Sequence, residues 1–176
     1  MRPEPERWTA RDGTVVTIRP IRAADFELER AFVDALSPAT GYQRLMSTRR
    51  PSSDEIKRFT DIDYEREMAL IATVVANGRE RQIGVARYVI DEAVPAEAEF
   101  AIVLADDWQH HGLGVKLLGS LIRAARAAGL RRLVGTTLSA NQAMLALARK
   151  AGFHLRLHPE AATTTLLTLD LYERAR

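Results

Sequence analysis

The stretch Glu97-Ala-Glu-Phe-Ala-Ile-Val-Leu-Ala-Asp-Asp-Trp-Gln-His-His-Gly-Leu-Gly-Val-Lys116 decides the fold. Its first half, Glu97–Ala105, has the composition of a strand, and a long helix is expected from about Gly112 to Ala128. Gly112 and Gly114 cost roughly 1 kcal/mol each relative to alanine in the first turn of that helix. Binding of a phosphate would compensate for this cost. Without Cβ atoms, the free N–H groups of the first turn can approach a phosphate closely, and the helix dipole favours negative charge there. The alternative is an irregular helix start with Gly112 as an entry turn.

Three apolar runs predict an antiparallel meander that ends at this stretch. They are Met68–Ala76, Gln82–Ile90 and Glu97–Ala105. Asn77-Gly78, between the first two runs, is a strong hairpin signal, and Pro95 lies in the loop between the second two. The helix at Gly112 therefore follows the third strand of a meander.

The chain before the meander is expected to form one strand and two helices. Thr14–Arg19 is rich in β-branched residues, which predicts a strand. Asp25 can cap a helix that Ser37-Pro38 stops, and the core-facing positions of this helix are Leu28, Phe32, Ala35 and Leu36. Ser52 and Glu55 form a capping-box pattern ahead of a second, short helix.

The chain after the long helix adds two strands and one helix. Gly129 is expected to end the long helix as a C-cap. A strand at Leu133–Leu138, a helix at Asn141–Ala151 and a last strand at Thr163–Leu171 follow. The pattern predicts an α+β fold with a mixed, mostly antiparallel central sheet and helices on both faces. It favours a single domain over residues 1–176, with residues 1–10 as a flexible tail.

Composition limits the classes of partner. The chain has 176 residues, of which 47% are hydrophobic and 27% charged, values typical of one globular domain. With Lys+Arg 25 and Asp+Glu 23, the net charge of +2 gives no reason to expect nucleic acid or membrane as a partner. Cysteine is absent, which excludes disulfides, a thiolate nucleophile and Cys-ligated metals. With no signal peptide and no membrane-length apolar run, we expect a cytoplasmic protein.

The loop before the long helix matches neither of two common phosphate-binding motifs. No Gly-Lys-Ser/Thr follows it, and Leu117 stands where a dinucleotide fingerprint has its third glycine. The pattern Q/R-x-x-G-x-G/A instead resembles the acetyl-CoA pyrophosphate loop of the GNAT superfamily of N-acetyltransferases. This resemblance implies that acetyl-CoA is the co-substrate and that its pyrophosphate contacts Gln109, His110, His111, Gly112, Leu113, Gly114, Val115 and Lys116.

The same resemblance implies two further contacts with acetyl-CoA. Val103 and Leu104, at the end of the preceding strand, would pair their main chain with the pantetheine arm. The segment that begins Asn141-Gln-Ala-Met is similar to the GNAT pattern N-x-x-x-x-x-L-Y-x-K-x-G-F, which implies that Asn141 contacts acetyl-CoA. The residues alone leave another role open, because Ser139 and Gln142 form a capping-box pattern with Asn141 in the first helical turn.

A closer resemblance extends over most of the chain. Asp12–Arg22, Gly41–Arg44 and Arg58–Leu70 resemble the GNAT domain of bacterial protein lysine acetyltransferases. In that family the domain is often fused to an acyl-CoA-synthetase-like or nucleotide-binding region, and it acetylates metabolic enzymes. This sequence contains no such region, so regulation through one is not expected. The resemblance implies that the acceptor is a lysine of a protein.

Acetyl transfer to a lysine needs a base, and Glu99 is the candidate. Deprotonating an ε-amine of pKa about 10.4 costs about 4.6 kcal/mol at pH 7, and a carboxylate can remove the proton directly or through one water. Strand alternation places Glu99 on one face with Ala101 and Val103, whose small side chains leave room for a ligand. The resemblance to lysine acetyltransferases also implies a glutamate base here. Glu97, on the same face, is the competing carboxylate.

The sequence departs from the wider family at one catalytic position. Many GNAT enzymes use a tyrosine to protonate the leaving thiolate, and the matching residue is Ala148. A thiol of pKa about 8.5 can leave without an acid. No general acid is therefore assigned. The lysine-acetylating relatives resemble this chain in lacking the tyrosine.

Other polar residues are given structural roles. His110 and His111 are adjacent and do not form a helical metal pair, and His154 and His158 have no acidic cluster beside them, so no metal site is expected. Trp108 is expected to pack at the strand end. A basic set near the early helices is interpreted as a solvated face, with an acidic protein target as the alternative: Arg44, Arg49, Arg50, Lys57 and Arg58. Asp63 and Tyr64 could line the acceptor entrance.

Three functions remain open from sequence. The first is an N-acetyltransferase that modifies a protein lysine. The second keeps the chemistry with a small amine as acceptor, such as a polyamine, an amino acid or an antibiotic. The third is a non-catalytic acyl-CoA-binding module in which Glu99 is structural. A homodimer is compatible with each of them.

Overall fold

The structure is a computed structural model that describes residues 1–45 and 49–172, without the side chains of residues 42–45. Its strands are β1 (Glu6–Thr9), β2 (Val15–Pro20), β3 (Glu67–Ala76), β4 (Arg79–Ile90), β5 (Glu97–Leu104), β6 (Arg132–Leu138), β7 (His154–His158) and β8 (Ala161–Asp170). Its helices are α1 (Phe26–Ala35), α2 (Pro38–Leu45), α3 (Ser53–Thr60), α4 (Leu113–Ala127) and α5 (Gln142–Lys150). Short 3₁₀ turns occupy Ala23–Asp25 and Asp106–Trp108.

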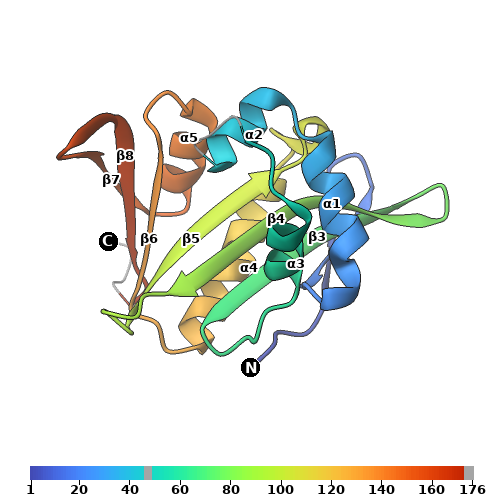
Figure 1. Ribbon diagram of the computed structural model, residues 1–176, viewed down its shortest axis with the longest axis horizontal. Helices are drawn as coiled ribbons and strands as arrows, with labels where there is room; N and C mark the ends of the chain where they lie inside the picture. The colour runs from blue at the N-terminus through green and yellow to red at the C-terminus, as the bar shows by residue number, and fades with distance from the viewer. Residues whose placement is uncertain (46–48, 173–176) are drawn as a thin grey trace.

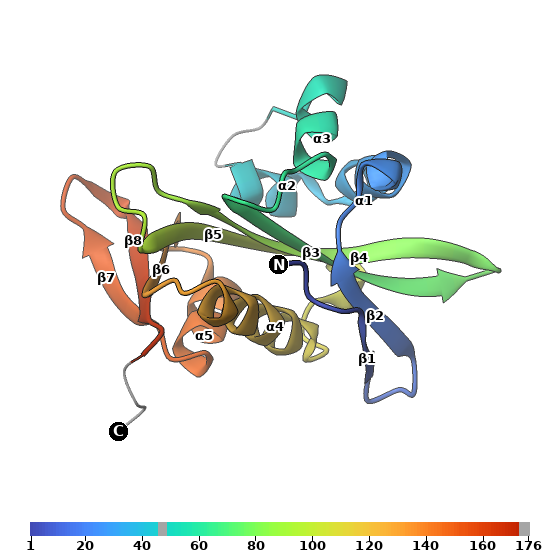
Figure 2. The same ribbon diagram turned by 90° about the horizontal axis from the view of Figure 1, so that it is seen from below.

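The strands form one mixed sheet, as the sequence predicts. Its order is β1-β2-β3-β4-β5-β6-β8-β7, and β5–β6 is its parallel pair. The helices α1, α2 and α3 cover one face of the sheet, and α4 and α5 lie on the other (Figures 1 and 2). Among the described helices, none combines the length and apolar character needed to cross a membrane.

The long helix α4 is held by its predicted apolar stripe. Leu113, Leu117, Leu118 and Leu121 are all 0% exposed. Each buried leucine contributes roughly 1.5–3 kcal/mol of transfer free energy. Gly129 has a φ of 79° just after the helix, which confirms the expected glycine C-cap. The meander is also confirmed: β3 and β4 pair antiparallel around Asn77-Gly78, where both residues have positive φ.

The parallel pairing between β5 and β6 ends soon after the two strands begin. Their pairing comprises Glu97↔Arg132, Ala98↔Leu133 and Glu99↔Val134. Beyond Glu99, β5 keeps its pairing with β4, while β6 pairs with β8 on its other side. The result is a V-shaped opening in the sheet with its apex at Glu99 and its wide end toward the start of α4.

Several sequence expectations are wrong in detail. The flexible tail expected over residues 1–10 includes β1, which pairs with β2 through register pairs such as Trp8↔Val16. Helix α2 was not expected, and the bounds of strand β7 were not predicted, although the element order left room for a second strand at the end of the chain. Both are short, and β7 carries two histidines and an arginine among five residues, so neither has a clear apolar period.

The first helix buries a different set of side chains from the one expected. Phe32 and Leu36 are buried as predicted, but Ala35 is exposed and Glu29 is 0% exposed. Asp25 does not cap α1 with its side chain. Its carboxylate instead accepts two hydrogen bonds of 2.8 Å from Arg19, and the Arg22 amide donates a third of 2.8 Å. Buried charges need such partners, and sequence periodicity does not reveal them.

Candidate functional site

The main cavity of the described chain fills the opening between β5 and β6. Its volume is about 470 Å³. Residues from the diverging strands form its walls, the loop and first turn before α4 close its wide end, and one face of α5 lies along it. The sequence-predicted residues among its lining are Val103, Leu104, Gln109, His110, Gly112, Gly114, Val115 and Asn141. The cavity thus brings together most of the predicted cofactor-binding residues.

Register shows which main-chain groups of β5 face the opening. At the two ends of the β4–β5 ladder, the Ala105 amide donates to Ile83 at 2.8 Å and the Glu97 carbonyl accepts from Asp91 at 2.9 Å. Odd-numbered residues between them therefore direct their main-chain groups toward β4, because these groups alternate along an antiparallel strand. Even-numbered Ile102 and Leu104 direct theirs toward the opening. The expected pairing with the pantetheine arm therefore stays a prediction for Leu104, whereas the main-chain groups of Val103 face β4.

The first turn of α4 presents uncapped amides to the wide end of the cavity. Its N-cap is Gly112, with a φ of 83° and no side-chain cap. The Lys116 amide is the first to bond within the helix, to the Gly112 carbonyl at 3.3 Å. The amides before it lie at the positive end of the helix dipole, where anions bind. His110 also has a positive φ, 65°, so the loop turns sharply before the helix.

Gly114, which the sequence assigned to phosphate approach, is also a position of close packing. A Cβ atom on it would lie 3.2 Å from Leu147 Cδ2 of α5 and 3.5 Å from Leu104 Cδ1. A side chain at this position would therefore push α4 away from α5 and β5. The glycine that the sequence assigned to phosphate approach also sets the width of the cavity.

Gln109 ties the loop to its surroundings. Its side-chain amide donates to the Leu104 carbonyl at 3.4 Å and to Thr40 Oγ1 of α2 at 3.3 Å. The loop is thereby attached to the end of β5 and to the opposite helical layer. Thr40 was not singled out from the sequence, and no local signal in α2 points to this long-range contact.

Lys116 and His111, two of the predicted cofactor-binding residues, do not direct their side chains into the main cavity. Lys116 Nζ lies 2.8 Å from Glu6 Oε2 of β1, and it does not line the main cavity. His111 lines a separate, smaller cavity of about 170 Å³ with Trp108 and residues of the β1–β2 turn. The ammonium group of Lys116 is therefore engaged by β1, and the predicted pyrophosphate contact of this residue stays a prediction for its main-chain amide. Leu113 is fully buried in the core, so only its amide could serve a ligand.

The electrostatics of the cavity favour an anionic ligand. Among its described lining residues there is no carboxylate, whereas Arg11, His110 and Lys150 are basic. The nearby Asp107 is paired with Arg81 at 2.8 Å and 2.9 Å, and these bonds lower the pKa of its carboxyl group. Helix α4 has no acidic residue in its first turn. The wide end of the cavity can therefore hold phosphate groups without a competing free carboxylate.

Glu99 lies at the apex of the opening, on the face opposite α4. Its neighbour on that face, Ala101, is opposite Arg87, which donates to the Phe59 carbonyl of α3 at 3.3 Å. Glu99 is exposed, and it directly precedes Phe100 and Ala101, which both line the cavity. On its own face of β5, the next residue that lines the cavity is Ala101, about 7 Å along the strand.

Glu97 is engaged by another residue. Its carboxylate accepts a hydrogen bond of 2.6 Å from Arg132 of β6. A carboxylate held by a guanidinium is not free to reach an acceptor. The geometry therefore favours Glu99 over Glu97 as the group available for proton transfer.

Asn141 lines the cavity and caps α5 at the same time. Its Oδ1 accepts from the Met144 amide at 3.2 Å, which makes Asn141 itself the N-cap. The capping box expected from Ser139 and Gln142 is therefore wrong. Ala148, at the position of the family tyrosine, is 0% exposed and offers no acid group.

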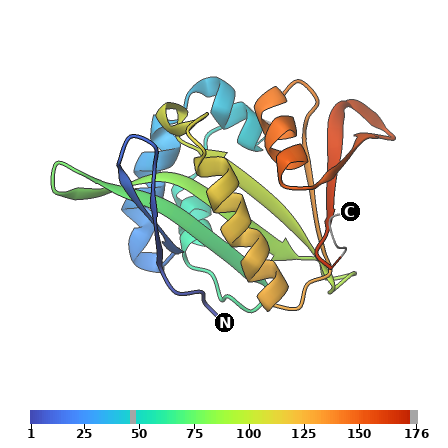
Figure 3. The same cartoon turned by 180° about the vertical axis from the view of Figure 1, so that it is seen from behind.

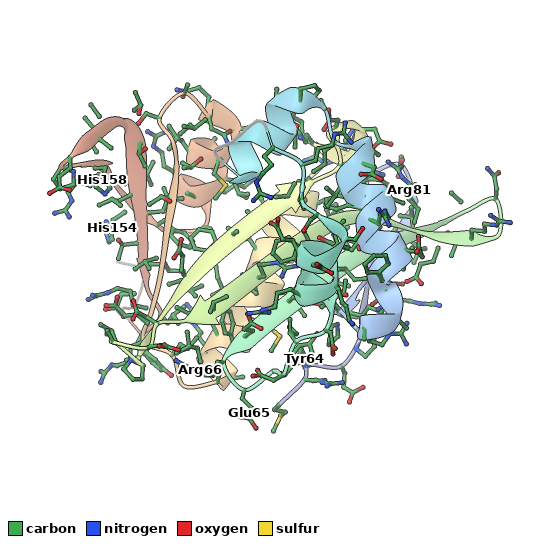
Figure 4. The ribbon with its side chains drawn as sticks, viewed as in Figure 1. Tyr64, Glu65, Arg66, Arg81, His154 and His158 are labelled. Atoms are coloured by element: carbon green, nitrogen blue, oxygen red, sulfur yellow. The ribbon has the colours of Figure 1, made fainter. Side chains whose placement is uncertain are left out.

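The remaining predicted residues lie away from the cavity. Arg49, Arg50 and Arg58 are paired with Glu55, Asp34 and Glu67 on the surface, as expected for a solvated face. The side chain of Arg44 is outside the described part of the structure. Tyr64 donates to the Ile21 carbonyl at 2.5 Å and is partly buried, so it joins two loops; burial raises its pKa to about 12. His154 and His158 lie on the edge strand β7 (Figure 4), and no metal-binding group occurs among the described residues.

A mixed sheet that opens between its parallel strands, beside a glycine-containing helix start, defines the fold of the acyl-CoA-dependent N-acetyltransferases. The family model described as the acetyltransferase (GNAT) domain matches residues 16–154. The chain therefore belongs to the GNAT family and is an N-acetyltransferase. Members of this family take acetyl-CoA as donor.

Individual relatives agree with this assignment. The chain is 36% identical over 161 residues to an acetyltransferase of Pseudomonas aeruginosa, which covers 91% of this chain and 86% of the relative. It is 30% identical over 142 residues to the acetyltransferase Pat of Mycolicibacterium smegmatis, covering 81% of this chain and 42% of that protein. The crystal structure of the GNAT domain of S. lividans PAT superposes with a TM-score of 0.84 at 28% identity, covering 94% of this chain and 96% of that chain.

Proposed function

We propose that this chain transfers the acetyl group of acetyl-CoA to the ε-amine of a protein lysine, with Glu99 as general base. The observation that carries the proposal is the opening of the sheet beyond Glu99. It exposes the main-chain edge of β5 at Ile102 and Leu104 and leads to the uncapped amides at Gly112–Val115. An extended arm with amide groups can pair with such an edge, and a diphosphate fits the helix start.

The reaction must remove a proton from the acceptor amine, and Glu99 is the group proposed to accept it. In the proposed step the amine nitrogen bonds to the thioester carbon, the C–S bond breaks, and Glu99 accepts the amine proton directly or through one water. The thiolate leaves and later takes a proton from solvent, because Ala148 supplies none. From Leu104 to Glu99 the strand spans about 17 Å, which separates the phosphate-binding end from the base by the length of an extended arm.

A protein acceptor is favoured by the exposure of the base. Glu99 and Ala101 are both exposed on the face of the sheet that α4 does not cover. A bulky chain carrying a lysine could reach such an open surface, whereas a small amine would be better held in an enclosed acidic pocket. The similarity to proteins named Pat and PAT supports the same acceptor class.

The test is incubation with labelled acetyl-CoA, using a matched bacterial proteome and, separately, a panel of small amines. We expect label on lysine side chains of proteins. Label found on small amines alone would move the assignment to a small-molecule acetyltransferase. Tight binding of acetyl-CoA with no transfer to either acceptor set would indicate a non-catalytic acyl-CoA-binding module.

A further inference from the structure

The phosphate-binding end of the main cavity lacks a lysine from its own loop. Lys116 is the basic residue in the first turn of α4, but its ammonium group is paired with Glu6. The basic side chains that line the cavity, within the described residues, are Arg11, His110 and Lys150. Of these, Arg11 comes from the N-terminal hairpin, far from the loop in sequence.

We propose that Arg11, at the turn between β1 and β2, is a phosphate-binding residue for the co-substrate. The inference rests on the proposed binding of acetyl-CoA in this cavity. It assigns a ligand contact to the N-terminal hairpin, whose first strand falls within the tail expected over residues 1–10. The guanidinium and the amides at the start of α4 would then contact phosphate oxygens from different elements.

The hairpin is attached to α4 along one face of β1. The Glu6 carboxylate binds Lys116 Nζ at 2.8 Å and Arg123 Nη2 at 2.8 Å, and it also accepts from Ser120. Trp8, two residues further along the same face, packs beside the helix start: a Cβ atom on Gly112 would lie 3.8 Å from its ring. These contacts fix the position of the hairpin relative to the phosphate-binding turn.

The turn that carries Arg11 has a defined backbone. The Ala10 amide donates to the Thr14 carbonyl at 2.9 Å, and the Gly13 amide donates to the Ala10 carbonyl at 2.9 Å. Asp12 Oδ1 accepts from the Thr14 amide at 2.9 Å, and this bond lowers the pKa of the Asp12 carboxyl group. Figure 3 shows this turn beside the loop that leads into α4.

Arg11 lies where the two cavities meet. It lines the main cavity and also the smaller one of about 170 Å³, and His110 lines both as well. Two carboxylates also border the smaller cavity. Asp12 is engaged by the Thr14 amide and Asp107 by Arg81, whereas Arg11 has no ion pair within the part of the chain that the structure describes. A guanidinium has five donors and binds phosphate well.

The test is the affinity of two variants for coenzyme A and for 3′-dephospho-coenzyme A, measured by titration calorimetry. Arg11→Gln removes the charge at the cavity. Arg7→Gln is the matched control, because Arg7 is exposed on β1 and lines neither cavity. We expect Arg11→Gln to weaken coenzyme A binding about tenfold or more, as for loss of a hydrogen bond between charged partners. Arg7→Gln should stay within about twofold of the wild type.

Comparison of coenzyme A with 3′-dephospho-coenzyme A shows whether Arg11 contacts the diphosphate or the 3′-phosphate. An equal loss for both ligands in Arg11→Gln identifies the diphosphate as the partner, and a loss for coenzyme A alone identifies the 3′-phosphate; both outcomes support the proposal. Equal affinities of Arg11→Gln and Arg7→Gln overturn it, even if the wild type binds tightly and the proposed function stands. Failure of the wild type to bind coenzyme A at all overturns the proposed function and this inference together.

Discussion

At the scale of single residues, Glu97 and Glu99 have the same side chain but different surroundings. Both lie on the same face of β5, but Arg132 holds Glu97 while Glu99 is exposed at the point where β6 leaves the strand. Strand alternation cannot distinguish the two carboxylates. Their partners and their positions along β5 decide which one is available for proton transfer. Lys116, in the first turn of α4, is likewise engaged by a partner that the sequence does not reveal, because it is paired with Glu6.

The first residue-scale prediction concerns the base. Glu99→Gln should lower the turnover number by about 100-fold or more, because general base catalysis contributes about 10²–10⁴-fold. The dissociation constant for acetyl-CoA should stay within about twofold, since the carboxylate does not line the cavity. Steady-state kinetics and calorimetry check both values. Glu97→Gln serves as the control and should keep most of the activity; a larger loss in Glu97→Gln would assign the base to Glu97.

The second residue-scale prediction concerns Gly112, which has a φ of 83° at the start of α4. Gly112→Glu should abolish measurable acetyl-CoA binding, because it places negative charge and bulk where phosphate is expected to bind. Gly129→Glu is the control: it also has a positive φ, 79°, with open space around it, at the other end of the helix. Both variants should lose about 1 kcal/mol of unfolding free energy from backbone strain. Unchanged affinity in Gly112→Glu would refute the phosphate site.

At the scale of elements, helix α5 combines capping with a wall of the cavity. Asn141 bonds the Met144 amide and also donates to Thr137 Oγ1 of β6 at 3.4 Å. It therefore joins the start of α5 to the strand that forms the other side of the opening. Spacing cannot distinguish an N-cap from a ligand contact at this position, because both use the same polar side chain.

Substitutions of Asn141 can separate those roles. Asn141→Ala should cost about 1 kcal/mol of unfolding free energy, the usual value for loss of an N-cap, whereas Asn141→Ser keeps an accepting oxygen and most of the stability. If Asn141 also contacts acetyl-CoA, both variants should bind it more weakly. Denaturant unfolding and calorimetry provide the two readouts. Wild-type affinity in both variants would leave Asn141 with a capping role alone.

At the scale of the whole molecule, the sheet is closely packed at the apex of its opening. The Phe100 ring follows the last β5–β6 pair and lies against Gly135, where a Cβ atom would be 2.7 Å from its Cε1. On its other side the ring packs against Phe153, at a centroid distance of 4.8 Å. Phe100 therefore occupies the space beside β6 at the level where the two strands separate.

Filling that space should be costly. Gly135→Ala is expected to lose about 1–3 kcal/mol of unfolding free energy through overpacking against Phe100. The double variant Gly135→Ala with Phe100→Leu should recover part of the loss, because the smaller side chain yields room. Gly41→Ala is the control, since a Cβ atom there meets nothing within 4 Å. Thermal or urea unfolding measures all three, and a Gly135→Ala variant as stable as the wild type would contradict the packing at the apex.

The local features of this protein were predictable from sequence because they depend on nearby residues. The α4 stripe, the Asn77-Gly78 turn, the Ser52–Glu55 capping box and the Gly129 C-cap are all present in the structure. Each follows from periodicity or from the backbone preference of one or two residues. The order of these elements also indicated the α+β class and the position of the loop before α4.

The sequence by itself determined the helix and strand pattern and the glycine-containing loop, since these are properties of short segments. The tertiary structure alone decided that residues 6–9 form a strand beside α4, that Lys116 is paired with Glu6, and that Arg11 lines the cavity. It also decided that β5 and β6 diverge after Glu99. These features depend on contacts between residues far apart in the chain, and neither hydrophobic period nor spacing encodes such partners.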